Sequence, residues 1–258
     1  MRDLKKLLSS TLILMSGFVS AQQYWITTGQ DVLPYIETKE TVFSSSLIGK
    51  GASTLVDSKQ IGKIHEIMHS KFGRCGGYVR HNSEKEALSF LKNSNKSSMS
   101  FVNYTINQAS TVNGVLAFVS EKKIYDTIKT LSSYPTRHYK SNDGIKSQQF
   151  IFDSWQALAA NRSDVKVEFF KHKSYGQPSV ILTITGSETP NEIVVIGGHA
   201  DSINQNWMSS KAPGADDNAS GIATITEALR LAMLTDYKPK KTVKFMAYAA
   251  EEVGLLGS

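Results

Sequence analysis

The chain has 258 residues, of which 40% are hydrophobic and 20% charged, and its formal net charge at pH 7 is +6. This composition is that of an ordinary globular protein and excludes a fibrous or disordered one. The lysines are dispersed, and their tightest cluster, at residues 238–241, falls in a predicted turn between a helix and a strand. We therefore expect no nucleic-acid partner.

The first 21 residues have the order of a secretory signal peptide. Basic residues from Arg2 to Lys6 precede an apolar run, and small residues follow up to Ala21. No segment approaches the ~20 consecutive apolar residues of a membrane span. The sequence thus predicts an exported protein that has no membrane contact once the signal is removed. Its single cysteine, Cys75, excludes an intramolecular disulfide.

Residues 22–118 are predicted to form a small α+β unit. Helical patterns cover residues 58–71 and 83–91, and the second opens with a capping-box pattern from Ser83 to Glu86. Polar stretches at residues 93–98 and 107–113 flank a strand candidate at residues 99–106. We place the domain boundary near the second polar stretch.

Residues 119–258 alternate between helical and strand patterns. Apolar stripes at helical spacing pass through Ile128, Ile151 and Ile225. Strand patterns follow at residues 165–169, 180–185, 192–196 and 243–248, and the third one, apolar after Glu192, is typical of a strand buried on both faces of a parallel sheet. The alternation predicts an α/β sandwich with a mixed sheet.

Three short motifs stand where a predicted strand ends or a predicted helix begins. His199 follows an apolar strand through Gly197 and Gly198, with Asp201 two residues further on. Ligands of open α/β sheets bind beyond the carboxyl ends of strands, so we expect His199 to bind a metal ion and Asp201 to hold its other ring nitrogen.

Two acidic pairs complete the candidate site. Asp216 and Asp217 precede a helix, where one can cap or orient while the other bridges two cations. Glu251 and Glu252 follow the last strand and, in an extended backbone, would point to opposite faces. One Glu can then bind metal while the other accepts a proton from water.

These motifs carry a resemblance to a known family. Residues from about 120 to 258 resemble the N-terminal half of the catalytic domain of secreted bacterial leucyl aminopeptidases. The matching segments are Val195-Ile-Gly-Gly-His199-Ala-Asp201-Ser, Ala212-Pro-Gly-Ala-Asp-Asp217-Asn-Ala-Ser-Gly221 and Phe245-Met-Ala-Tyr-Ala-Ala-Glu251-Glu252-Val-Gly254. Ala200 stands where relatives commonly have Leu.

The resemblance implies a metallopeptidase that removes N-terminal, preferably hydrophobic, residues from peptides with a water activated by two zinc ions. His199 would bind one zinc, Asp217 would bridge both, Glu252 would bind the other, and Glu251 would be the general base. It also implies a cis peptide bond after Asp217, a monomer, and a three-layer sandwich whose largely parallel sheet is incomplete here. Residues 22–118 resemble, more weakly, the pro-segments of these enzymes, which assist folding or cover the site before removal.

The family's remaining Asp and His ligands, and most of its side-chain pocket, come from sequence beyond Ser258. Each zinc would then keep two protein ligands, whereas catalytic zinc usually has about three. From this we expect the 258-residue chain, taken alone, to bind metal weakly and to show little or no peptidase activity.

Other interpretations remain open. Residues 65–69 fit the H-E-x-x-H pattern, which on a helix would bring His65 and His69 to one zinc with Glu66 as base. Glu84 and Glu86 are the nearest third ligands, but they belong to the first turn of another helix, so we favour a chance match. The chain could also be a non-catalytic fragment or a binding protein on the enzyme scaffold. Glutaminyl cyclases and certain carboxypeptidases share that scaffold.

Overall fold

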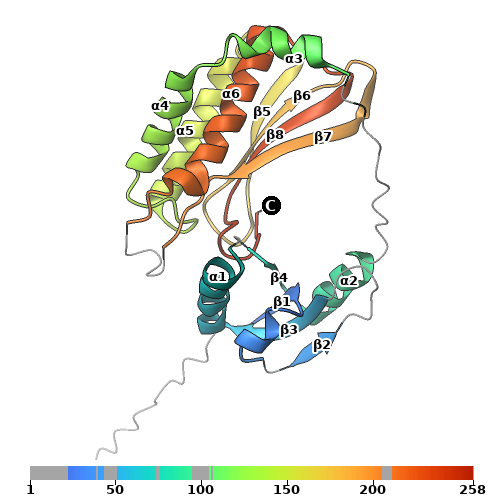
Figure 1. The fold of residues 1–258 in the computed structure, drawn as a ribbon, viewed down its shortest axis with the longest axis vertical. Coiled ribbons are helices and arrows are strands. Elements are labelled where there is room, and N and C mark those ends of the chain that lie inside the picture. Colours follow the sequence, from blue (N-terminus) through green and yellow to red (C-terminus); the bar gives the residue numbers. More distant parts are fainter. Residues whose placement is uncertain are drawn as a thin grey trace, which may run out of the picture.

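The computed structural model of the protein describes residues 23–38, 40–43, 51–73, 76–94, 105, 107–204 and 211–257. They form two four-stranded sheets, one from each part of the chain (Figure 1). None of the described helices is long and apolar enough to cross a membrane. The predicted signal peptide and most of the strand candidate at residues 99–106 lie outside the described residues.

The N-terminal sheet has the order β2-β3-β1-β4, and each neighbouring pair is antiparallel. Its core consists of apolar side chains from the sheet and from α1, including Ile26, Val56, Ile64 and Met68. The elements are β1 (Gln23–Gly29), a 3-10 turn (Leu33–Tyr35), β2 (Thr41–Phe43), β3 (Gly51–Asp57), α1 (Ser58–Phe72), β4 (Tyr78–His81) and α2 (Glu84–Ser94).

Both predicted helices of this part are confirmed, and so is the cap of the second. The Ser83 hydroxyl accepts a hydrogen bond from the Glu86 amide at 3.2 Å, while the Glu86 carboxylate accepts from the Asn82 amide rather than from Ser83. A third helix, α3 (Ala109–Leu116), occupies the stretch predicted to be a polar connection. Val112, Val115 and Leu116, spaced three and four residues apart, are the helical signal that the polar neighbours masked.

The C-terminal sheet has the order β5-β6-β8-β7. Its mixed character is confirmed, but the expectation of a largely parallel sheet is wrong, because only β7 and β8 run parallel. A parallel neighbour needs a long crossover, and only the β7–β8 connection contains a helix. The elements are α4 (Glu121–Ser133), α5 (Asn142–Ala159), β5 (Val165–Phe170), β6 (Ser179–Ile184), β7 (Thr189–His199), α6 (Gly221–Leu234) and β8 (Lys241–Tyr248).

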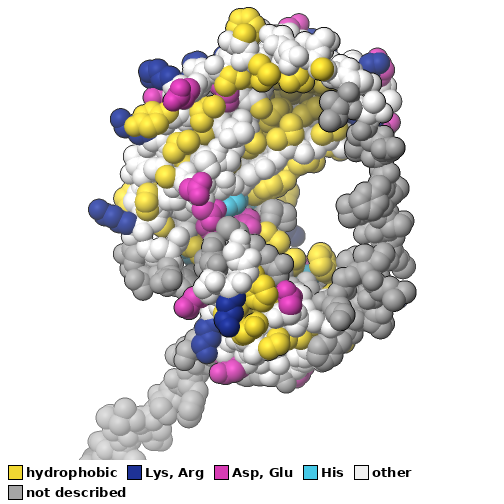
Figure 2. Space-filling model, in the orientation of Figure 1, with side chains coloured by type: hydrophobic (Ala, Val, Ile, Leu, Met, Phe, Trp, Pro, Cys, Tyr) yellow, Lys and Arg dark blue, Asp and Glu magenta, His cyan; other side chains and the backbone are white. Residues whose placement is uncertain are grey.

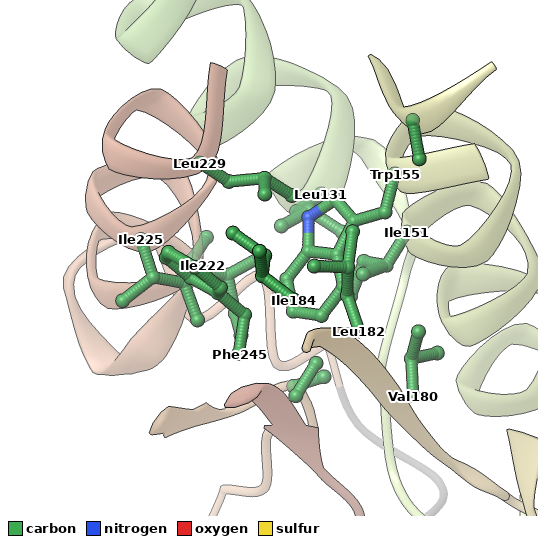
Figure 3. Packing of buried hydrophobic residues seen from close by; sticks show 14 residues of the cluster. Leu131, Ile151, Trp155, Val180, Leu182, Ile184, Ile222, Ile225, Leu229 and Phe245 are labelled. Carbon is green, nitrogen blue, oxygen red and sulfur yellow. The ribbon is translucent and has the colours of Figure 1, made fainter. Parts of the chain in front are cut away.

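Helices α4, α5 and α6 lie together on one face of this sheet (Figure 1). Within the described residues the sandwich therefore has one helical layer, not the two that a three-layer arrangement requires. Trp155, Leu182 and Ile222 are fully buried between helices and sheet (Figure 3), and the Trp155 indole donates to the Thr226 hydroxyl at 2.9 Å. This core fixes α6 against β7 and β8.

Strand β7 differs from its prediction in burial. Its apolar segment was expected to be covered on both faces, yet Ile193 is 54% exposed and Val195 is 49% exposed. Two features explain this within the described residues: β8 is its single strand neighbour, and helices cover only one face of the sheet.

Candidate metal centre

The candidate site lies at the carboxyl ends of the parallel strands β7 and β8. His199 is the last residue of β7 and lies in register with Tyr248, the last residue of β8. Gly197 and Gly198 precede His199, and the Tyr248 ring occupies the space that a side chain at Gly197 would need. The glycine at this position thus permits the close packing of the two strand ends beside the site.

The predicted metal-binding residues lie together. Ligand atoms of His199, Asp217 and Glu252 all lie within 4.8 Å of one another. The His199 Nε2 atom is 2.9 Å from Asp217 Oδ1 and 3.8 Å from Glu251 Oε2. Figure 2 shows a group of acidic side chains around one histidine on the displayed face of the molecule.

Asp201 contacts His199 and the main chain of both glutamates. Its carboxylate is fully buried, lies 3.5 Å from His199 Nδ1, and accepts hydrogen bonds from the amides of Glu251 at 3.0 Å and Glu252 at 3.2 Å. The His199 Nδ1 atom also lies 3.2 Å from the Asp201 carbonyl oxygen. One carboxylate therefore fixes the imidazole and the position of both glutamates.

Burial and the closeness of several carboxylates shift the pKa values of the site residues. Burial raises the pKa of Glu252 to about 8, and the nearby Asp217 and Asp201 add to the rise. Burial also raises the pKa of Glu251, which His199 partly offsets. Burial lowers the pKa of His199, but hydrogen bonds to Asp201 and Asp217 outweigh it and raise that pKa to about 11. The site therefore favours a cation near these oxygens.

Asp217 sits in a kinked segment (Ala215–Ser220) that leads into α6, and the backbone angles of Asp217 and Asn218 are not helical. The peptide bond between Asp217 and Asn218 is cis, as the resemblance predicts. The Asn218 side chain accepts from the Gly221 amide at 2.9 Å and so caps the new helix. Asp216 is exposed and lies outside the ligand group, so of the two adjacent acids only Asp217 belongs to it.

The expected extended backbone at the two glutamates is wrong. Residues 252–254 form a turn, and Ala250 before it has a positive φ of 53°. Because the chain turns there, both carboxylates lie on the His199 side instead of on opposite faces.

Two buried residues that sequence reasoning did not single out support the site. Gln177 accepts from the Ala250 amide and donates to the carbonyls of Arg137 and Gly144. The Arg137 side chain is fully buried and donates to four main-chain carbonyls. Neither residue occurs in a recognisable motif, and their partners are distant in sequence.

The N-terminal sheet approaches the site through β4. The Arg80 amide donates to the Gly254 carbonyl at 3.2 Å, and the Tyr78 ring lies so close to Gly254 that a Cβ there would be 2.5 Å from it. Gly76 is also near Glu251, since a Cβ on it would lie 3.5 Å from Oε1. The H-E-x-x-H segment does fall on a helix, α1, but the side chains of His65 and His69 lie outside the described residues.

The chain is similar in sequence to known peptidases. Residues 179–258 match the sequence model of Peptidase family M28. Leucine aminopeptidase 1 of Arthroderma gypseum is 42% identical over 163 residues, which cover 60% of this chain and 43% of that protein. The chain thus spans less than half the length of the curated relatives it matches.

Two solved structures from Legionella pneumophila are similar over 92% of this chain. LapB is 26% identical with a TM-score of 0.72, and 64% of its chain is covered. The LapA aminopeptidase is 23% identical with a TM-score of 0.72, and 65% of its chain is covered. Their likeness extends to the N-terminal sheet and shows that the fold is shared.

Proposed function

With residues 179–258 assigned to peptidase family M28, we propose that the protein is a zinc aminopeptidase that removes N-terminal, preferably hydrophobic, residues from peptides. His199, Asp217 and Glu252 would hold zinc, with Asp217 shared between two ions, and Glu251 would be the general base. The observation that carries the proposal is the convergence of an imidazole and two carboxylates within 4.8 Å, with Glu251 beside them.

The donor set fits zinc. Imidazole nitrogen and carboxylate oxygen are ligands that zinc accepts in catalytic sites. Four carboxylates, those of Asp201, Asp217, Glu251 and Glu252, lie around one imidazole, and burial together with the neighbouring acids raises the pKa of Glu251 and Glu252. Divalent cations would offset that repulsion, because a bound ion is the largest local charge in such a site.

The roles of the protein side chains follow from their positions. Bound zinc would polarise the substrate carbonyl and lower the pKa of a water molecule. Glu251, whose pKa is raised by burial, is suited to take a proton from the attacking water and to return it to the departing amine. Its Oε2 atom is buried and has no hydrogen-bond partner among the described residues, so it is available for that proton. Asp201 would keep the imidazole and both glutamates in place.

We also propose that the protein is exported and that residues 22–118 act as a pro-segment. The support for export is the order of residues 1–21. The support for the second role is the contact of β4 with the loop after β8, where Tyr78 and Arg80 meet Gly254 and Gly76 lies near Glu251. A segment in this position would restrict access to the base.

Metal binding by a version of the protein as long as its curated relatives tests the ligand assignment. Zinc affinity is measured by competition with a chelating indicator for the wild type and for Asp217→Asn, Glu252→Gln and Glu251→Gln. We expect the first two substitutions to lower the affinity by at least about tenfold, and Glu251→Gln to leave it nearly unchanged. Asp216→Asn, the exposed neighbour, is the matched control. Wild-type protein that binds no zinc, or equal affinities throughout, would contradict the assignment.

Hydrolysis of a leucine chromogenic amide tests the reaction, in a version of the protein as long as its curated relatives. We expect Glu251→Gln to lower kcat by about 10² to 10⁴ while zinc content stays at the wild-type level, because a positioned base contributes that much. Full zinc content without turnover in the unsubstituted protein would favour a binding protein built on the enzyme scaffold.

A further inference from the structure

Arg137 is a buried cation that follows α4 in the chain. It lies beside two loops that carry proposed metal ligands: residues 200–202, directly after His199, and residues 212–214, shortly before Asp217. The Pro135 carbonyl accepts from the Ala212 amide at 2.7 Å, and Thr136 forms a parallel bridge with Ala212. On its other side, the Arg137 amide donates to the Ser202 hydroxyl at 3.0 Å. The main chain around Arg137 is thus attached to both loops.

The guanidinium reaches the same two loops. Its Nε donates to the Ala200 carbonyl at 2.8 Å, immediately after His199. Its two terminal nitrogens donate to the carbonyls of Pro213 and Gly214, the latter at 2.9 Å and three residues before Asp217. The Gly214 carbonyl also accepts from the Ala219 amide at 3.0 Å, which closes the turn around Asp217.

The charge on Arg137 is unusual for its burial. Its side-chain donors all bind carbonyl oxygens, whereas Arg162 and Arg230 pair with the carboxylates of Asp164 and Glu227. Burial lowers the pKa of Arg137 to about 10, against which Asp201, Glu252 and Asp217 raise it, so the group stays protonated at neutral pH. A buried charge without a close counter-ion costs stability, which argues for a role beyond packing.

We propose that Arg137 is a positioning residue whose planar guanidinium sets the separation of His199 and Asp217, and thereby the spacing of the metal ligands. The inference rests on the proposed function for the identity of the bound ion. The rigid fork of arginine suits this task, because it presents several donors in one fixed plane. Lysine keeps the charge but carries its three donors on one nitrogen, so it lacks the planar, spread fork that reaches the carbonyls of Ala200, Pro213 and Gly214 at once.

Arg137→Lys tests the proposal with two readouts. The first is zinc affinity, which we expect to fall by about 10- to 100-fold, as for other groups that orient metal ligands. The second is amide hydrogen exchange without metal, which we expect to quicken about tenfold at residues 212–219 and to stay unchanged in α6. Arg162→Lys, at a buried arginine distant from the motifs, is the matched control and should change neither readout.

A second variant covers the case in which Arg137→Lys fails to fold. Ser202→Ala removes the hydroxyl that donates to Ala212 and accepts from the Arg137 amide, so exchange at residues 212–219 should quicken in the same direction. Unchanged exchange in the folded variants, or zinc affinity within about twofold of the wild type in Arg137→Lys, would overturn the proposal. If the wild type binds no zinc, the proposed function fails, while the exchange data still decide the role of Arg137.

Discussion

The two sheets of the molecule differ in how their strands are connected, and this difference decides where chemistry can occur. The N-terminal sheet is antiparallel throughout, and its strand ends carry no group of metal-ligand side chains among the described residues. The C-terminal sheet contains one parallel pair, β7 and β8, whose carboxyl ends open on the same edge as the start of α6. His199, Asp217 and Glu252 come from these three places.

The same contrast bears on the H-E-x-x-H pattern, whose two histidine side chains lie outside the described residues. The H-E-x-x-H segment lies on α1, which connects β3 to β4 across β1 on a small sheet whose neighbouring strands are all antiparallel. The three C-terminal motifs are far apart in the sequence, but the β7–α6–β8 crossover brings them to one point. The β7–α6–β8 topology and the residue pattern together therefore indicate a metal site at these strand ends.

The two sheets can be compared by removing one buried polar side chain from each. We expect the largest loss in the free energy of unfolding at Asp201, in the C-terminal part. Asp201→Ala deprives the amides of Glu251 and Glu252 and the His199 ring of an acceptor, so we expect a loss of about 3 kcal/mol in the free energy of unfolding. Less repulsion with Glu252 offsets only part of this loss. Urea unfolding followed by circular dichroism measures it.

The N-terminal counterpart is the buried hydrogen bond between Thr27 and His81. Thr27→Val removes a single bond and should cost about 1 kcal/mol. Equal losses in the two variants would show that Asp201 does not organise its sheet more strongly than an ordinary buried hydroxyl does.

A smaller effect on the free energy of unfolding is expected from the Glu227 carboxylate, which connects two helices on the C-terminal sheet, α4 and α6. The Glu227 carboxylate on α6 accepts from Arg230 and from the Ser120 amide at the start of α4, and these contacts lower its pKa. Because the folded pKa lies below the unfolded one, this stabilisation is present above the ordinary pKa of Glu and is lost as the pH falls through the lowered value. We expect Glu227→Gln to cost about 1 to 2 kcal/mol at pH 7 and less at pH 3.

Urea titrations of wild type and variant between pH 7 and pH 3 measure the difference. Asp126→Asn is the control, because its pair with Lys122 is exposed and should contribute less than about 0.5 kcal/mol. A Glu227→Gln difference that grows as the pH falls would contradict the sign of the pKa shift.

The sequence predicted local elements of the C-terminal sheet well, because their signals are local. The helix expected at residues 143–160 is Asn142–Ala159, and the strand expected at residues 165–169 is Val165–Phe170. The strand expected at residues 192–196 extends over Thr189–His199, since Pro190 and Glu192 concealed its start. Strand direction was mispredicted because it depends on connections across the sheet, which no local pattern encodes.

The candidate site shows the same limit. The positions of His199 and of the two acidic pairs could be predicted because strand ends and helix starts are visible in the sequence. The choice of Asp217 and Glu252 within those pairs rested on the family resemblance. The contribution of Arg137 could not, since its partners Ala200 and Gly214 are 63 and 77 residues away. Their carbonyl oxygens are main-chain atoms, so no residue type marks them.

The smallest effect on folding, with a clear effect on association, is expected at the sheet edges. The N-terminal sheet ends in the three-residue β2 on one side and in β4, which meets Gly254, on the other. The C-terminal sheet ends in the 11-residue β7, whose apolar side chains are exposed. A long apolar edge is a template for pairing with another chain.

Val195→Lys should therefore change the free energy of unfolding by less than about 0.5 kcal/mol but reduce self-association measured by sedimentation velocity. Val42→Lys on β2, where Val42 is 39% exposed, is the matched control and should leave association unchanged, because so short an edge offers few pairing groups. If both variants associate as the wild type does, self-association does not occur through the β7 edge.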